Sequence, residues 1–131
     1  MKFLAFLTLS AALGTTAFAQ SISIQAPADG TTVKAGSSIT VEVIQHSSIS
    51  DLVQVGLAIG LGIPNSAPGI GGNILYNEPF NLGVPGMQNI TVTIPASTPA
   101  GLMSLNVAHF DLVGAIKIPH VETVNITLNV V

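Results

Sequence analysis

The sequence predicts an all-β domain: an immunoglobulin-like or fibronectin-like antiparallel β-sandwich of about seven strands, preceded by a signal peptide. Two observations predict this class, and a third shows that the chain would belong to it by architecture only. Apolar and polar residues alternate in several short segments, most regularly in residues 121–131. Turn residues separate these segments, and no stretch shows a convincing helical period. The sequence has neither cysteine nor tryptophan, so the disulfide and central tryptophan of antibody domains are missing. A closed barrel is the alternative architecture.

The first 19 residues read as a secretory signal peptide. Lys2 gives a positive start, residues 3–13 are an apolar run, and residues 17–19 form the small-x-small cleavage site Ala-Phe-Ala. This run is shorter than the roughly 20 residues that cross a bilayer, so we expect no membrane span after cleavage. The mature chain would be residues 20–131, a single secreted, extracellular immunoglobulin-like domain.

Two strands are expected near the start of the mature chain. Residues 21–25 alternate isoleucine with serine, and residues 39–44 alternate apolar with polar side chains. Residues 26–30 contain proline and an Asp-Gly pair, and residues 35–38 contain Ala-Gly, both typical of turns. This order of strand, turns and strand is typical of an immunoglobulin-like opening.

The middle of the chain is apolar and free of charge. Residues 52–63 are apolar on both alternating faces, which predicts a strand covered on both sides, either within a sheet or by another segment. Three glycines in this run disfavour a helix. Residues 64–72 are expected to form a loop, and residues 73–76 a short strand.

Three more strands complete the prediction. Residues 89–94 alternate until Pro95 stops them, and a turn-rich stretch leads to a strand that begins at Leu102. Residues 121–131 form the last strand, whose dry face consists of Val124, Ile126, Leu128 and Val130.

The charge composition excludes several classes of partner. The whole chain has three basic and six acidic residues, none of them arginine. Binding to a phosphate backbone or to anionic lipid requires clustered positive charge, so we expect no nucleic-acid partner and no attraction to anionic membranes. The absence of cysteine leaves hydrophobic burial to hold the fold.

The histidines are the only candidates for metal or proton-transfer chemistry. His109 and Asp111 would share one face of a strand, but no second pair of ligands has a suitable spacing, so isolated histidines at strand ends are the preferred interpretation for His46, His109 and His120. The chain has no Gly-x-Ser-x-Gly motif and no cysteine nucleophile. We therefore expect no metal site, no cofactor, no catalytic residue and no enzymatic activity.

Two sequons are present, at Asn89 and Asn125. Each asparagine falls on the wet face of a predicted strand, where a glycan could be accepted, so both are candidate glycosylation sites in a eukaryote.

The apolar middle has two interpretations. Most apolar strand residues are buried, so core plus a tight loop is the simpler one. The other is an exposed patch that binds a protein partner. Its candidate residues are Ile59, Leu61, Ile63, Ile70 and Ile74.

The layout of the chain resembles a known family. Residues 20–23 read Gln-Ser-Ile-Ser, and a Gln-x-Ser-Ser-Ile-x-Asp segment begins at residue 45. Residues 53–61 read Val-x-Val-Gly-Leu-Ala-Ile-Gly-Leu, residues 90–101 read Ile-Thr-Val-Thr-Ile-Pro-Ala-Ser-Thr-Pro-Ala-Gly, and Leu-Val-Gly-Ala follows at residue 112. Together they are similar to small secreted fungal proteins of the necrosis-inducing secreted protein 1 type.

This resemblance implies a fungal effector without enzymatic activity. Such a protein would bind host proteins, among them immune-receptor-associated kinases, and would modulate plant immunity or cell death. The alternative is a structural or carbohydrate-associated module of the fungal cell wall, similar to the amino-terminal domain of β-glucan assembly proteins. A pull-down from plant extract, compared with binding to insoluble glucan, would discriminate between the two.

Overall fold

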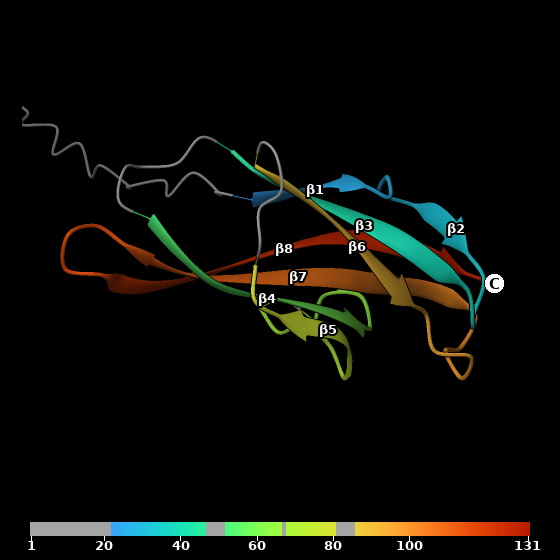
Figure 1. Cartoon of the computed structure of the whole chain (residues 1–131). Coiled ribbons are helices and arrows are strands. Elements are labelled where there is room, and N and C mark those ends of the chain that lie inside the picture. Colours follow the sequence, from blue (N-terminus) through green and yellow to red (C-terminus); the bar gives the residue numbers. More distant parts are fainter. Residues whose placement is uncertain (1–21, 47–51, 67, 81–85) are drawn as a thin grey trace, which may run out of the picture.

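The structure is a computed structural model that describes residues 22–46, 52–66, 68–80 and 86–131. These residues form eight strands and no helix (Figure 1). The prediction of an all-β chain is therefore confirmed, while the count of seven strands is wrong. The predicted signal peptide lies outside the described residues. The strands are β1 (Ile22–Ala26), β2 (Thr31–Val33), β3 (Ser38–Gln45), β4 (Leu52–Gly62), β5 (Asn73–Glu78), β6 (Met87–Thr93), β7 (Gly101–Val113) and β8 (Ile118–Val130).

The strands form two sheets that pack as a sandwich. The smaller sheet has the order β1-β3-β6, and the larger has the order β2-β8-β7-β4-β5. All pairings are antiparallel except that of β2 with β8, which is parallel. The prediction of a purely antiparallel sandwich is wrong for the pair of β2 and β8. The strand β2 was not predicted, because its three residues are too few to show an alternating pattern.

Aliphatic side chains from both sheets fill the space between them. Removing these side chains from water is the main stabilising contribution in a chain without disulfides. The most completely buried include Ile22, Val41, Val43, Leu57, Ile59, Leu61, Leu105, Val107 and Leu128.

A chain segment also covers part of the outer face of the larger sheet. The described residues of the connection between β4 and β5, 63–66 and 68–72, lie against this face at the level of Gly60 and Gly62. A Cβ atom at Gly60 would overlap the carbonyl oxygen of Ile70, and one at Gly62 would lie 2.7 Å from the Cα of Gly71. Glycine is therefore required here for the close approach. The second half of β4, from Leu57 to Gly62, is buried on both faces as the sequence predicts, whereas Val53 and Val55 in the first half are exposed.

A β-bulge shapes the first part of β4. Gln54 pairs with Asp111 of β7, but Gly56 pairs with Phe110, so Val55 is the extra residue. Because of this shift, both Gln54 and Leu57 point into the sandwich. Within the described ranges, no helix is long and apolar enough to cross a membrane.

Candidate functional site

The β7–β8 hairpin extends beyond the smaller sheet at one end of the sandwich (Figure 1). On its inner face, His109 pairs across the strands with Glu122, and Asp111 pairs with His120. Directly opposite residues in an antiparallel pair have neighbouring side chains, so the register alone brings these four polar groups together.

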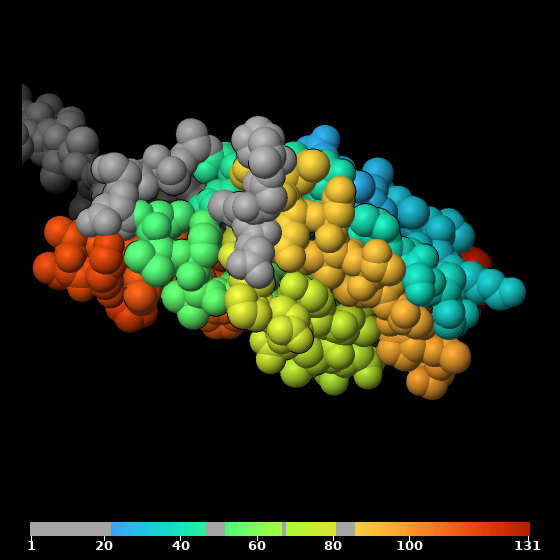
Figure 2. Space-filling view, in the orientation of Figure 1, coloured from blue at the N-terminus to red at the C-terminus, as the bar shows by residue number. Residues whose placement is uncertain are grey.

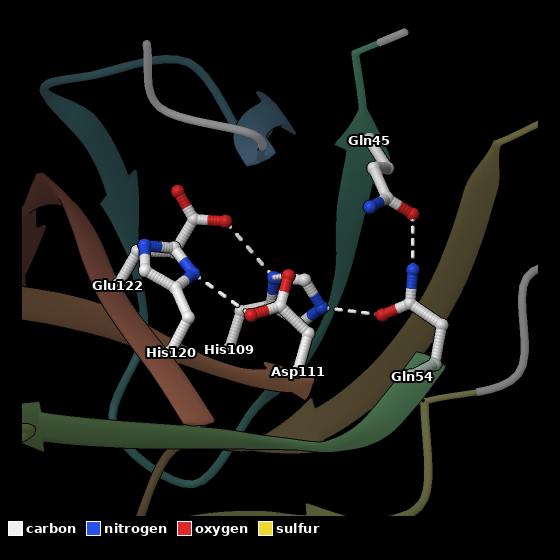
Figure 3. A network of polar contacts seen from close by, with 6 residues as sticks. All are labelled: Gln45, Gln54, His109, Asp111, His120 and Glu122. Carbon is white, nitrogen blue, oxygen red and sulfur yellow. Dashed lines mark hydrogen bonds and ion pairs between the residues drawn. The ribbon is translucent and has the colours of Figure 1, made fainter. Parts of the chain in front are cut away.

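A chain of polar contacts starts at this cluster and crosses the sandwich (Figure 3). The Nδ1 atom of His109 is 2.9 Å from Glu122 Oε1, and its Nε2 atom is 2.5 Å from Gln54 Oε1 on β4. The side-chain amide of Gln54 donates in turn to Gln45 on β3. The chain of contacts therefore links β8, β7 and β4 of the larger sheet to β3 of the smaller one.

His109 is fully buried at the centre of this chain. Both of its ring nitrogens lie within hydrogen-bond distance of a side-chain oxygen, Nδ1 of Glu122 and Nε2 of Gln54. A second carboxylate, that of Asp111, lies 4.0 Å from Nδ1. The ring of Phe80 meets the imidazole edge to face, with centroids 5.2 Å apart. The site therefore holds His109 rigidly and away from solvent.

Asp111 and His120 form the more accessible pair. Asp111 is buried, and its Oδ1 atom is 2.8 Å from Nδ1 of His120, whose side chain is one-third exposed. A carboxylate that orients a histidine can support proton transfer, yet the described residues hold no group of three or more His, Cys, Asp or Glu side chains that could bind a metal ion. The contacts fit a structural role between the sheets, and we call this network the polar clamp. It consists of Gln45, Gln54, His109, Asp111, His120 and Glu122.

The histidine predictions are confirmed in part. His109 and Asp111 do share a face of one strand. The interpretation of His109 as an isolated strand-end histidine is wrong, since it lies within β7 and is buried, whereas the exposed His46 follows β3 and contacts Ser23. The sequence does contain a pattern that could have predicted this cluster. His109-x-Asp111 and His120-x-Glu122 stand on either side of the turn at Gly114, and a hairpin with this turn places the two pairs opposite each other.

The predicted apolar patch is corrected by the burial of its members. Ile59 and Leu61 are fully buried in the core, so assigning them to a surface patch is wrong. Ile63 and Ile74 are exposed, and Ile70 is half-buried where its backbone packs on Gly60. Successive side chains of a strand point to opposite faces of the sheet. Ile59 and Leu61 therefore point into the core, while Gly60 and Gly62 face the connection that carries Ile63 and Ile70.

A second apolar surface, absent from the prediction, lies at the hairpin end of the sandwich. The first residues of β4 and the hairpin lie side by side here, as the green and orange atoms in Figure 2 show. Phe110 and Val121 are cross-strand partners on the outer face, and Ile116 at the turn is 81% exposed. We name this surface the apolar end. It consists of Val53, Val55, Phe110 and Val121, together with Ile116 at the turn, all exposed.

Both predicted glycosylation residues are exposed. Asn89 lies on β6 and Asn125 on β8, on the outer faces of the two different sheets. Each position has the accessibility that an attached glycan needs, and attachment itself stays a prediction.

A family model, that of the Nis1 family, matches residues 17–129, which include all of the clamp and the apolar end. No curated protein matches the chain.

Proposed function

The chain belongs to the Nis1 family, a family of fungal effector-like proteins, and on this premise we propose that it is a secreted, non-enzymatic effector that binds host proteins and modulates plant immunity or cell death. Immune-receptor-associated kinases are the proposed host partners. The structural observation that supports binding is the apolar end: several large apolar side chains are exposed together on β4 and the β7–β8 hairpin. Clustered exposure of this kind is typical of protein interaction surfaces.

The chemistry of the apolar end favours a protein partner. Its outer face carries valine and phenylalanine on three neighbouring strands. Lys117 is the charged residue in the turn between β7 and β8. Aromatic and aliphatic side chains surrounded by few charges are characteristic of the buried centre of interfaces. The three exposed or half-buried members of the predicted patch, Ile63, Ile70 and Ile74, are proposed as a secondary contact.

The proposed lack of enzymatic activity is supported by the clamp. His109, at the centre of the clamp, is fully buried and both of its ring nitrogens contact protein oxygens. General acid–base catalysis requires a group within reach of the substrate. A structural role for His109 is therefore the better-supported one.

We also propose that residues 1–19 act as a signal peptide and that the mature sandwich is immunoglobulin-like. The orders β1-β3-β6 and β8-β7-β4 match the A-B-E and G-F-C orders of immunoglobulin domains. The short β2 would correspond to a first strand that changes sheets and runs parallel to the last one. Glycosylation at Asn89 and Asn125 belongs to the same proposal, because it requires passage through a secretory pathway.

The binding proposal is tested by a pull-down from plant extract with the secreted protein as bait. We expect Val121→Asp, in the apolar end, to reduce recovery of the host protein about tenfold or more, as central interface residues do. Leu102→Asp is the matched control: Leu102 is 59% exposed and Val121 57% exposed, and they lie at opposite ends of the same hairpin. Equal recovery with both variants would contradict the assignment of binding to the apolar end.

The alternative is a structural or carbohydrate-associated cell-wall module. Binding to insoluble glucan, measured in parallel on the same preparation, separates the two functions. Retention on glucan together with no recovered host protein would overturn the effector proposal.

A further inference from the structure

The two sequons lie on the strand edges that lack other protection against strand addition. An edge strand exposes a row of backbone groups to which another chain can pair, and proteins protect edges with bulges, prolines, charges, or very short strands. The described sheets have such edges at β1, β2, β5 and β6, and along the part of β8 that precedes its pairing with β2. The start of β4, before its pairing with β5, is also free, and it is interrupted by the bulge at Val55.

Three of these edges carry protective features. The register of β1 is interrupted between Ile24 and Ala26, and Pro27 follows it. The strand β5 is also bulged, and it ends in Glu78 and Pro79. The strand β2 has only three residues. None of them offers a long, regular edge.

The edge formed by β6 is different. It pairs with β3 in an unbroken register from Met87 to Thr93 and contains neither proline nor a charged residue. Among the described strands, only β3 pairs with it in a sheet. The sequon asparagine Asn89 lies in this strand, exposed on the outer face of the smaller sheet.

The edge formed by β8 repeats this arrangement on the opposite side of the sandwich. Its pairing with β7 is unbroken, and β2 joins it only at Leu128–Val130. Pro119 and Glu122 interrupt its first residues, which leaves Thr123 to Ile126 regular and uncharged. The second sequon asparagine, Asn125, is exposed within this stretch.

We propose that N-linked glycans on Asn89 and Asn125 protect these two edges and keep copies of the chain from pairing edge to edge. A glycan rooted on an edge strand occupies the space that an added strand would need. The two modifications would then replace the bulges, prolines and charges that protect the other edges. This proposal rests on the proposed secretion, but it concerns association of the protein with itself and not binding to a host partner.

The test compares variants secreted from a glycosylating yeast, each purified and examined by size-exclusion chromatography with light scattering over a concentration series. Asn89→Gln/Asn125→Gln removes both glycans and leaves uncharged edges. Its apparent dimer dissociation constant should fall about tenfold or more below that of the glycosylated protein. Thr91→Lys/Thr127→Lys also destroys both sequons but adds a charge to each edge, and it should stay monomeric.

Two further samples keep the test decisive. Asn77→Gln alters an exposed strand asparagine outside any sequon and should leave association unchanged. Wild-type protein trimmed to one sugar per site after folding should associate like the double glutamine variant, whether or not that variant folds. The proposal is overturned if the wild-type protein carries no glycan, if the trimmed protein stays monomeric, or if the lysine variant associates as strongly as the glutamine variant.

Discussion

The two halves of β7 have opposite polarity on each face of the larger sheet. On the inner face, Met103, Leu105 and Val107 pack in the core, whereas His109 and Asp111 belong to the polar clamp. The change occurs at the level of the end of β3, whose last residue, Gln45, is joined to His109 through Gln54. Apolar side chains fill the space between the two sheets, and hydrogen-bonded polar groups close its end.

On the outer face of the larger sheet, the first half of β7 is polar and the second half is apolar. Ser104 and Asn106 are buried beneath residues 63–72, and Asn106 donates to the Ile70 carbonyl oxygen at 3.1 Å and accepts from Ser104 at 2.8 Å. Further along the strand, Phe110 is exposed. In the first half the chain thus covers its own polar side chains, while in the second half it leaves an aromatic side chain uncovered.

This contrast separates residues that hold the fold from residues available to a partner. Buried polar groups are tolerated where each finds a hydrogen-bond partner, as Asn106 does. Exposed apolar groups bring the fold little stability. Substitutions in the covered half should therefore act on stability, and substitutions in the apolar end on binding.

The largest effect is expected from Leu105→Ala in the covered half. Leu105 is fully buried between the sheets, so truncation loses its transfer free energy and leaves a cavity. The free energy of unfolding should fall by about 4 kcal/mol, measured by urea denaturation. Leu102→Ala, at a neighbouring exposed position, should change it by less than about 0.5 kcal/mol. Similar losses for both would contradict the division between core and surface.

A somewhat smaller loss is expected from His109→Ala in the clamp. The substitution leaves Glu122 and Gln54 without the partner that joins them, inside the end of the sandwich. Leaving buried hydrogen-bonding groups without a partner should lower the free energy of unfolding by about 3 kcal/mol. His46→Ala, on the exposed histidine after β3, is the control and should have little effect. If both variants are equally stable, the clamp does not couple the two sheets.

Much of the fold could be predicted from local alternation. The apolar and polar periods located every strand except β2, whose three residues are too few to show a period. The apolar run of residues 52–63 correctly indicated a strand covered on both faces only from Leu57 to Gly62, because Val53, Val55 and Ile63 are exposed. It could not indicate what covers it, because that depends on the path of residues 63–72 over Gly60.

The candidate site was less predictable because it depends on register and bulges. Gln54 joins the clamp only because the bulge at Val55 turns it inward, and no local pattern reveals a single added residue. The apolar end was missed for a similar reason. Val121 and Phe110 look like ordinary strand residues until the register shows that both lie on a face without a covering segment.

The smallest loss of stability among these three substitutions is expected from Gly60→Ala. This substitution tests whether the close approach at Gly60 holds the β4–β5 connection over the first half of β7. The new methyl group would overlap the carbonyl oxygen of Ile70, so the segment of residues 63–72 must shift away from β4. Overpacking of this kind should lower the free energy of unfolding by about 2 kcal/mol. The shift would also weaken the hydrogen bond from Asn106 to Ile70 and expose more of Ile70 to solvent.

The matched control for this change is Gly72→Ala. It adds the same methyl group to the same connection, but at a position with nothing within 4 Å of the new atom, so stability should be unchanged or slightly higher. Limited proteolysis should cut residues 63–72 faster in Gly60→Ala than in Gly72→Ala. Equal cleavage would show that the close approach at Gly60 does not hold this segment on the sheet, and the covered half would then need another explanation for its burial.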